Sequence, residues 1–88
     1  MKTLTKHKKL EVANVCYANV SSLFATFTSS KMRGPNFTWE RFPEICKGWA
    51  STWVFTHGIK GDKDALEQCA EEYAVEIAQR LVNIMKEE

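Results

Sequence analysis

The chain has 88 residues, of which 44% are hydrophobic and 26% are charged, and its twelve basic side chains nearly balance eleven acidic ones. This composition is typical of one small globular domain and argues against global disorder. The balanced charge gives the chain little overall attraction for nucleic acid. The longest uncharged stretch, 12–30, holds too many Ser, Thr and Asn residues for a membrane span.

The first predicted element is a helix over about 5–31. Apolar residues recur at helical spacing through this segment and mark a face directed toward a core. The predicted inner face consists of Leu10, Ala13, Tyr17, Val20, Phe24 and Phe27, widened by Val12, Cys16 and Leu23. Gly34 and Pro35 then predict a turn inside an aromatic connection over 33–42.

The second predicted element is a short turn over 39–42 that leads into a helix over 43–57. Pro43 suits the first helical position, because the N–H that proline lacks has no partner there. The predicted inner face consists of Phe42, Ile45, Cys46, Trp49, Trp53 and Thr56. Phe55 points away from this face, and Gly58 predicts a left-handed stop at the end of the helix.

The third predicted element is a helix over 64–86, capped by Asp62 or Asp64. Its principal apolar stripe is Leu66, Ala70, Tyr73, Ile77, Leu81 and Ile84. A second stripe, centred on another side of the same helix, is Val75, Ala78, Val82 and Met85. Because a three-helix monomer needs one buried face per helix, the second stripe predicts a further interface.

These elements predict an all-α fold, a small three-helix bundle with two long outer helices and a shorter aromatic-rich central helix, as a single domain over 1–88. Residues 2–9 lead into Glu11 and not into an apolar run, so no signal peptide is expected. Three Cys residues without CxxC spacing predict reduced thiols in a cytoplasmic protein.

The concentration of aromatic residues between positions 37 and 55 favours a protein-interaction function. The second stripe of the third helix adds to this surface, and it serves either an antiparallel homodimer through that helix or a different protein. The residues predicted to contact a partner are Phe37, Trp39, Phe55, Val75, Val82 and Met85. For Phe37 and Trp39 the alternative is a lid that folds over the end of the bundle.

A nucleic-acid-binding function is the alternative, because basic side chains cluster near the N-terminus and after the first helix. The candidate phosphate contacts are Lys6, Lys8, Lys9, Lys31 and Arg33. The third helix, however, opens with five carboxylates in 62–72, which would repel phosphate at a recognition helix. The same opposite charges would also attract each other in a bundle whose first and third helices run parallel.

The sequence contains no catalytic, cofactor or metal motif. His7 and His57 have no carboxylate pair, Ser or Cys placed beside them by local spacing, and neither GxGxxG nor GxxxxGK[ST] occurs. Metal binding would require cysteines and histidines to converge from different helices. The sequence therefore predicts a non-enzymatic interaction module without a cofactor. By fold-level analogy, small phage or mobile-element accessory proteins that inhibit or modulate a host protein have this build.

Overall fold

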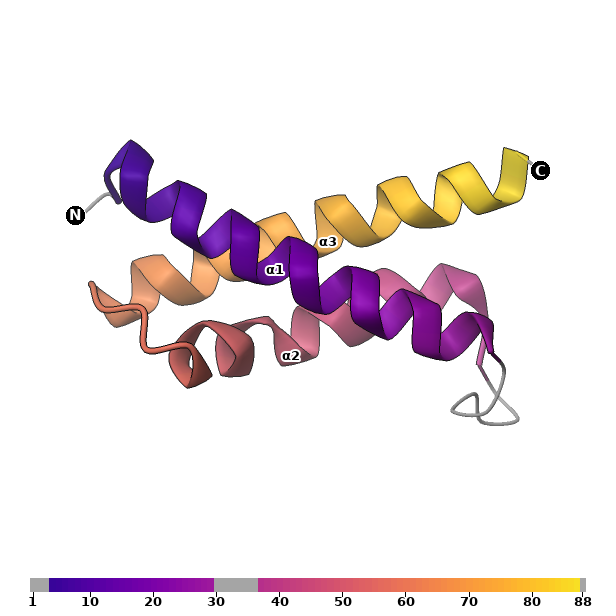
Figure 1. The fold of residues 1–88 in the computed structure, drawn as a ribbon, viewed down its shortest axis with the longest axis horizontal. Coiled ribbons are helices and arrows are strands. Elements are labelled where there is room, and N and C mark those ends of the chain that lie inside the picture. Colours follow the sequence, from indigo (N-terminus) through magenta and orange to yellow (C-terminus); the bar gives the residue numbers. More distant parts are fainter. Residues whose placement is uncertain (1–3, 30–36, 88) are drawn as a thin grey trace.

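The computed structural model describes residues 4–29 and 37–87, and within them the chain forms three α-helices. These are α1 (Lys6–Thr28), α2 (Phe42–Thr56) and α3 (Lys63–Glu87), and a 3-10 turn, η1 (Trp39–Arg41), precedes α2. α1 and α3 run in the same direction and α2 runs against both (Figure 1). The predicted all-α fold with a shorter central helix is confirmed.

The helix ends follow local signals in the sequence. Thr5 Oγ1 accepts a hydrogen bond of 3.1 Å from the Lys8 N–H at the start of α1. At the start of α3, Asp62 Oδ2 accepts one of 3.1 Å from the Ala65 N–H, so Asp62 and not Asp64 is the cap. Gly58 ends α2 with a φ of 73°, which confirms the predicted left-handed stop.

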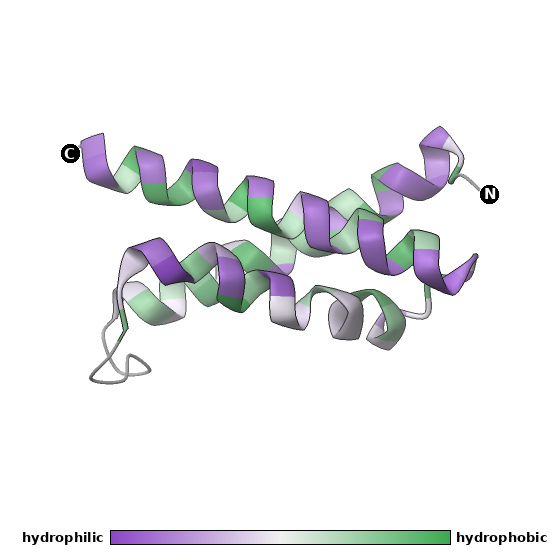
Figure 2. Ribbon diagram, turned by 180° about the vertical axis from the view of Figure 1, so that it is seen from behind, coloured by the Kyte–Doolittle hydropathy of each residue, from purple (hydrophilic) through white to green (hydrophobic). Residues whose placement is uncertain are grey.

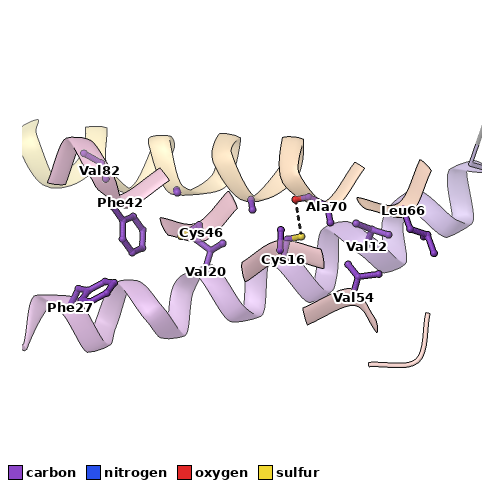
Figure 3. Close-up of a cluster of buried hydrophobic side chains, with 13 residues drawn as sticks. Val12, Cys16, Val20, Phe27, Phe42, Cys46, Val54, Leu66, Ala70 and Val82 are labelled. Carbon is purple, nitrogen blue, oxygen red and sulfur yellow. Dashed lines mark hydrogen bonds between the residues drawn. The ribbon is translucent and has the colours of Figure 1, made fainter. Parts of the chain in front are cut away.

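The core is built on one row of buried side chains per helix, each with a spacing of four residues (Figure 3). The rows are Val12, Cys16 and Val20 on α1; Phe42, Cys46, Ala50 and Val54 on α2; and Leu66, Ala70, Ala74, Ala78 and Val82 on α3. Rows of this spacing form the ridges that pack into the grooves of a neighbouring helix. The small alanines of α3 bring its backbone close to its neighbours, and Cys16 Sγ lies 3.5 Å from the Ala70 carbonyl oxygen, to which it donates.

The predicted inner faces were wrong only in part. The structure buries eight of the predicted side chains: Val12, Cys16, Val20, Phe27, Phe42, Cys46, Leu66 and Ala70. Four side chains that were predicted to point inward are 53–63% exposed: Leu10, Tyr17, Trp49 and Ile84. The prediction followed the largest side chains, whereas the centre of each helix contact is occupied by small or β-branched ones. Bulky side chains lie at the flanks of these contacts, where Trp53, Tyr73, Ile77 and Leu81 are half-buried.

The prediction of a separate second stripe on α3 was also wrong. Ala78 is 0% exposed and Val82 is 1% exposed, so both belong to the core of the monomer. Each step of four residues turns a row by about 40° around the helix axis. The buried side of α3 therefore moves around the helix from Leu66 to Val82, and what looked like a second stripe is the C-terminal part of the core row. Val75 and Met85 are half-buried beside it.

Five aromatic rings close the end of the bundle where α1 ends and α2 begins. Phe42 is fully buried, and its ring centroid lies 5.7 Å from Phe24, 5.8 Å from Phe27 and 5.5 Å from Trp39. Phe37 lies 5.0 Å from Phe27 and 5.1 Å from Trp39. These are favourable distances for aromatic pairs. Of the two alternatives for Phe37 and Trp39, the structure confirms the lid over the bundle end.

Candidate protein-interaction surface

An apolar groove runs between α1 and α3 on the side of the bundle away from α2. It has a volume of about 450 Å³. Its lining residues are Ala13, Asn14, Tyr17, Tyr73, Glu76, Ile77, Arg80, Leu81 and Ile84. We call this the α1/α3 groove. α1 and α3 diverge toward their C-terminal ends (Figure 1), which leaves this part of α3 uncovered by α1. Tyr17 and Ile84 are each more than half exposed.

Helical spacing explains why these side chains share the groove. Tyr17 lies one turn after Ala13 on the flank of α1 that faces α3. On α3, Tyr73, Ile77 and Ile84 follow the i, i+4, i+11 positions of one face. The core row of α3, which here consists of Ala74, Ala78 and Val82, lies on another side of the helix. The result is an apolar channel between two helices.

Charges of both signs stand at the rim of the groove. The Arg80 guanidinium donates to the Glu76 carboxylate at 3.0 Å, an i, i+4 pair that is largely exposed to solvent. Such a pair contributes little to stability. It does place one negative and one positive group along the edge of the apolar channel, where they can select the polarity of a charged ligand.

The predicted partner-contact residues do not gather in one patch. Phe37 and Trp39 belong to the aromatic cluster at the bundle end, and Val82 belongs to the core. Val75 lines a shallow pocket between α2 and α3, and Met85 is half-buried. Phe55 is 42% exposed on the outer side of α2, as the sequence predicted for its direction.

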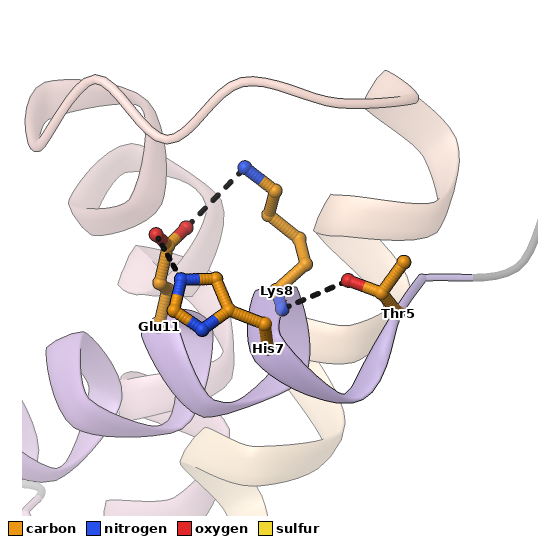
Figure 4. A network of polar contacts seen from close by, with 4 residues as sticks. All are labelled: Thr5, His7, Lys8 and Glu11. Atoms are coloured by element: carbon orange, nitrogen blue, oxygen red, sulfur yellow. Dashed lines mark hydrogen bonds and ion pairs between the residues drawn. The ribbon is translucent and has the colours of Figure 1, made fainter.

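The predicted phosphate contacts are only partly free. Lys8, one of the predicted contacts, is paired with Glu11: one carboxylate oxygen of Glu11 lies 3.3 Å from Lys8 Nζ, and the other lies 3.4 Å from Nε2 of the neighbouring His7 (Figure 4). Lys6 and Lys9 are exposed. The other two predicted contacts, at positions 31 and 33, lie outside the described residues.

The three thiols, one from each helix, are neighbours. Burial raises the pKa of Cys16 to about 11, and the nearby Cys69 acts in the same direction. Burial likewise raises the pKa of Cys46 to about 12, with a further contribution from Cys16. Both groups are therefore uncharged thiols at neutral pH. Within residues 4–29 and 37–87, no three Cys, His, Asp or Glu side chains are arranged to hold a metal ion.

The groove residues Tyr17 and Ile84 were visible in the sequence but were assigned to the core. The sequence signal that distinguishes core residues from groove residues on α3 is the row of small residues, Ala70, Ala74 and Ala78, which repeats every four positions and marks the true contact line of that helix.

No protein-family model, curated protein or solved structure shows significant similarity to the chain. Over the part of the chain that the structure describes, no helix is long and apolar enough to cross a membrane.

Proposed function

We propose that the protein is a non-enzymatic binding module whose α1/α3 groove takes an amphipathic helix from a partner protein. The observation that carries this proposal is the exposure of Tyr17 and Ile84 in a groove whose lining is largely apolar. Large exposed apolar side chains that line one depression are a common feature of protein-interaction sites. Binding there would occlude or bridge the partner by surface contact alone.

The shape of the groove favours a helix as the ligand. Two neighbouring helices offer a channel into which a third can lay its apolar face, as in other helix-in-groove complexes. The ligand helix would present apolar side chains at i, i+3 or i+4, and i+7 to reach Tyr17, Ile77 and Ile84. Glu76 and Arg80 at the rim would favour a ligand with complementary charges beside its apolar face.

Photo-crosslinking in the native host tests this proposal. A photoreactive phenylalanine analogue replaces Ile84 in the groove or, as a control, Gln79, which is exposed on α3 but does not line the groove. We expect position 84 to give a discrete crosslinked protein that position 79 does not give. In a second arm, Ile84→Glu should abolish capture of that protein and Gln79→Glu should leave it unchanged, because only the first puts a carboxylate into the apolar channel.

Two results would contradict the proposal. One is equal crosslinking from positions 84 and 79, which would mean that contact with the groove is not specific. The other is capture that survives Ile84→Glu. Circular dichroism of both variants provides the control for folding, and both should keep the helical signal of the parent because Ile84 and Gln79 are exposed.

A further inference from the structure

The outward side of α2 carries no charged side chain over its last nine residues. Positions 48–56 consist of Gly, Trp, Ala, Ser, Thr, Trp, Val, Phe and Thr. Gly48, Trp49, Thr52 and Phe55 are exposed. Figure 2 shows the contrast: the C-terminal half of α2 has pale and green tones, whereas α3 alternates between purple and green. Solvent-facing helix surfaces are usually rich in charge, so this face is unusual for one that stays in water.

No contact among the described residues explains why position 48 is a glycine. A glycine inside a helix costs about 1 kcal/mol relative to alanine, so it usually marks a close approach by other atoms. A Cβ placed on Gly48 meets nothing within 4 Å, apart from its own helix and its chain neighbours. The space in front of Gly48 is open, and no packing in the described structure requires it.

Phe55 lies seven residues, or two turns, after Gly48 on the same side of α2. The exposed ring of Phe55 is a protrusion, and the missing side chain of Gly48 is a depression. An antiparallel second α2, related by a two-fold axis between Ser51 and Thr52, places each Phe55 over the Gly48 of the other copy. A surface that fits itself in this way is the basis of an isologous dimer.

We propose that the outward face of α2 is a homodimer interface, formed by Gly48, Trp49, Thr52 and Phe55 of two antiparallel copies. The charge pattern supports a second copy as the occupant, because an uncharged face can pack against itself without repulsion. The charge pattern also favours an antiparallel orientation of the two α2 helices. A parallel pair would place the two Glu44 carboxylates side by side, where they would repel each other, whereas an antiparallel pair separates them. The interface lies on the opposite side of the bundle from the α1/α3 groove, so a dimer leaves both grooves open.

A membrane surface is the other class of partner for an apolar helix face. Helices that bind there carry several Lys or Arg residues on the polar side. Within Phe42–Thr56, Lys47 is the only Lys or Arg residue, and the negative charge of Glu44 balances it. The composition of α2 therefore favours the second copy.

Sedimentation equilibrium of the purified chain, from low micromolar to near-millimolar concentration, tests the dimer. The parent should show a monomer–dimer equilibrium. Gly48→Leu fills the depression and Phe55→Ala removes the protrusion, and each should weaken self-association by at least ten-fold. Gly48→Leu should also raise the thermal midpoint of the dilute monomer, because leucine favours a helix more than glycine does. Lys47→Leu, on the α3 side of the same helix, is the matched control and should leave the equilibrium unchanged.

Mixing the two variants gives the sharper result. Gly48→Leu keeps the Phe55 protrusion and Phe55→Ala keeps the Gly48 depression, so one intact contact forms between them, and the new leucine faces the new alanine at the other. We expect the mixture to associate where each variant alone does not. A monomeric parent, Gly48→Leu dimers as tight as the parent's, or a mixture that stays monomeric would each overturn the proposal. So would loss of the dimer on Ile84→Glu, which would assign it to the groove, or binding of a monomeric parent to phosphatidylcholine–phosphatidylserine vesicles.

Discussion

Val82 and Val75 allow the rotation of α3 to be measured with one chemical change at two positions. Val82 is 1% exposed in the core, whereas Val75 is half-buried at the flank of the same helix. Replacing either with alanine removes the same two methyl groups and changes the intrinsic helix propensity by the same amount. The difference in stability between the two variants therefore reports the difference in burial.

The expected cost for Val82→Ala follows from its burial. Two methyl groups lose about 0.8 kcal/mol each of transfer free energy, and the cavity that remains adds to this, for a total of roughly 2–3 kcal/mol. Val75→Ala should cost less than about 1 kcal/mol, because part of the side chain is already in contact with water. In a chain of this size, each kcal/mol lowers the thermal midpoint by about 4–8 °C.

Urea unfolding followed by circular dichroism measures both values. A chain of 88 residues has a total stability of roughly 4–13 kcal/mol, so both variants should still fold. We expect equal slopes with urea and a clearly lower midpoint for Val82→Ala. If Val75→Ala is as destabilising as Val82→Ala, α3 is rotated relative to this description and the α1/α3 groove has a different lining.

Three further predictions concern the tryptophans, the thiols and the basic N-terminal segment. Trp53→Ala should lower the free energy of unfolding by at least about 1 kcal/mol more than Trp49→Ala, because Trp49 is more than half exposed; equal losses in urea unfolding would contradict the rotation of α2. Because the pKa values of Cys16 and Cys46 are raised in the folded protein, these thiols ionise at lower pH in the unfolded chain. The free energy of unfolding should therefore decrease above pH 9, by up to about 1.4 kcal/mol per pH unit for each thiol. In a Cys16→Ala/Cys46→Ala double variant, most of this pH dependence should be absent. Fluorescence anisotropy with labelled DNA and RNA should show little binding at physiological salt; sub-micromolar affinity there would support the nucleic-acid alternative.

The class of fold could be predicted because strong local signals agree with it. The stop at Gly58 depends on the low cost of a positive φ for glycine, and the cap at Asp62 depends on a side chain that reaches the free N–H groups of the first turn. Neither depends on contacts far away in the chain. The helical spacing of the apolar residues predicts amphipathic helices. Three such helices joined by short connections bury their apolar sides most simply as a bundle.

The rotation of the helices could not be predicted from the size of the side chains. A helix contact is decided by how closely two backbones approach, and small residues such as Ala74 and Ala78 allow the closest approach. Large side chains such as Tyr17 and Trp49 then lie at the flanks, where partial exposure is tolerated. A search for apolar periodicity that ranks residues by hydrophobicity alone therefore underestimates how often alanine marks the line of contact between two helices.

The α1/α3 groove was missed for a second reason. Ile84 was placed in the core and Val82 on the surface, and the structure reverses the two. The error arose because the apolar residues of α3 were divided into two stripes of fixed direction, whereas a single core row turns steadily along its 25 residues. Following the four-residue row from Leu66 identifies Val82 as buried and leaves Ile84 for the groove.

Oxidative footprinting of the partner complex tests the central claim, that the protein acts through contacts in the α1/α3 groove. Hydroxyl radicals modify exposed aromatic side chains, and mass spectrometry gives the extent of oxidation at each position. We predict that Tyr17 is strongly oxidised in the free protein and protected in the complex purified from the native host, while the exposed imidazole ring of His57, which does not line the groove, changes less. Equal oxidation of Tyr17 in the free and complexed protein would contradict the claim.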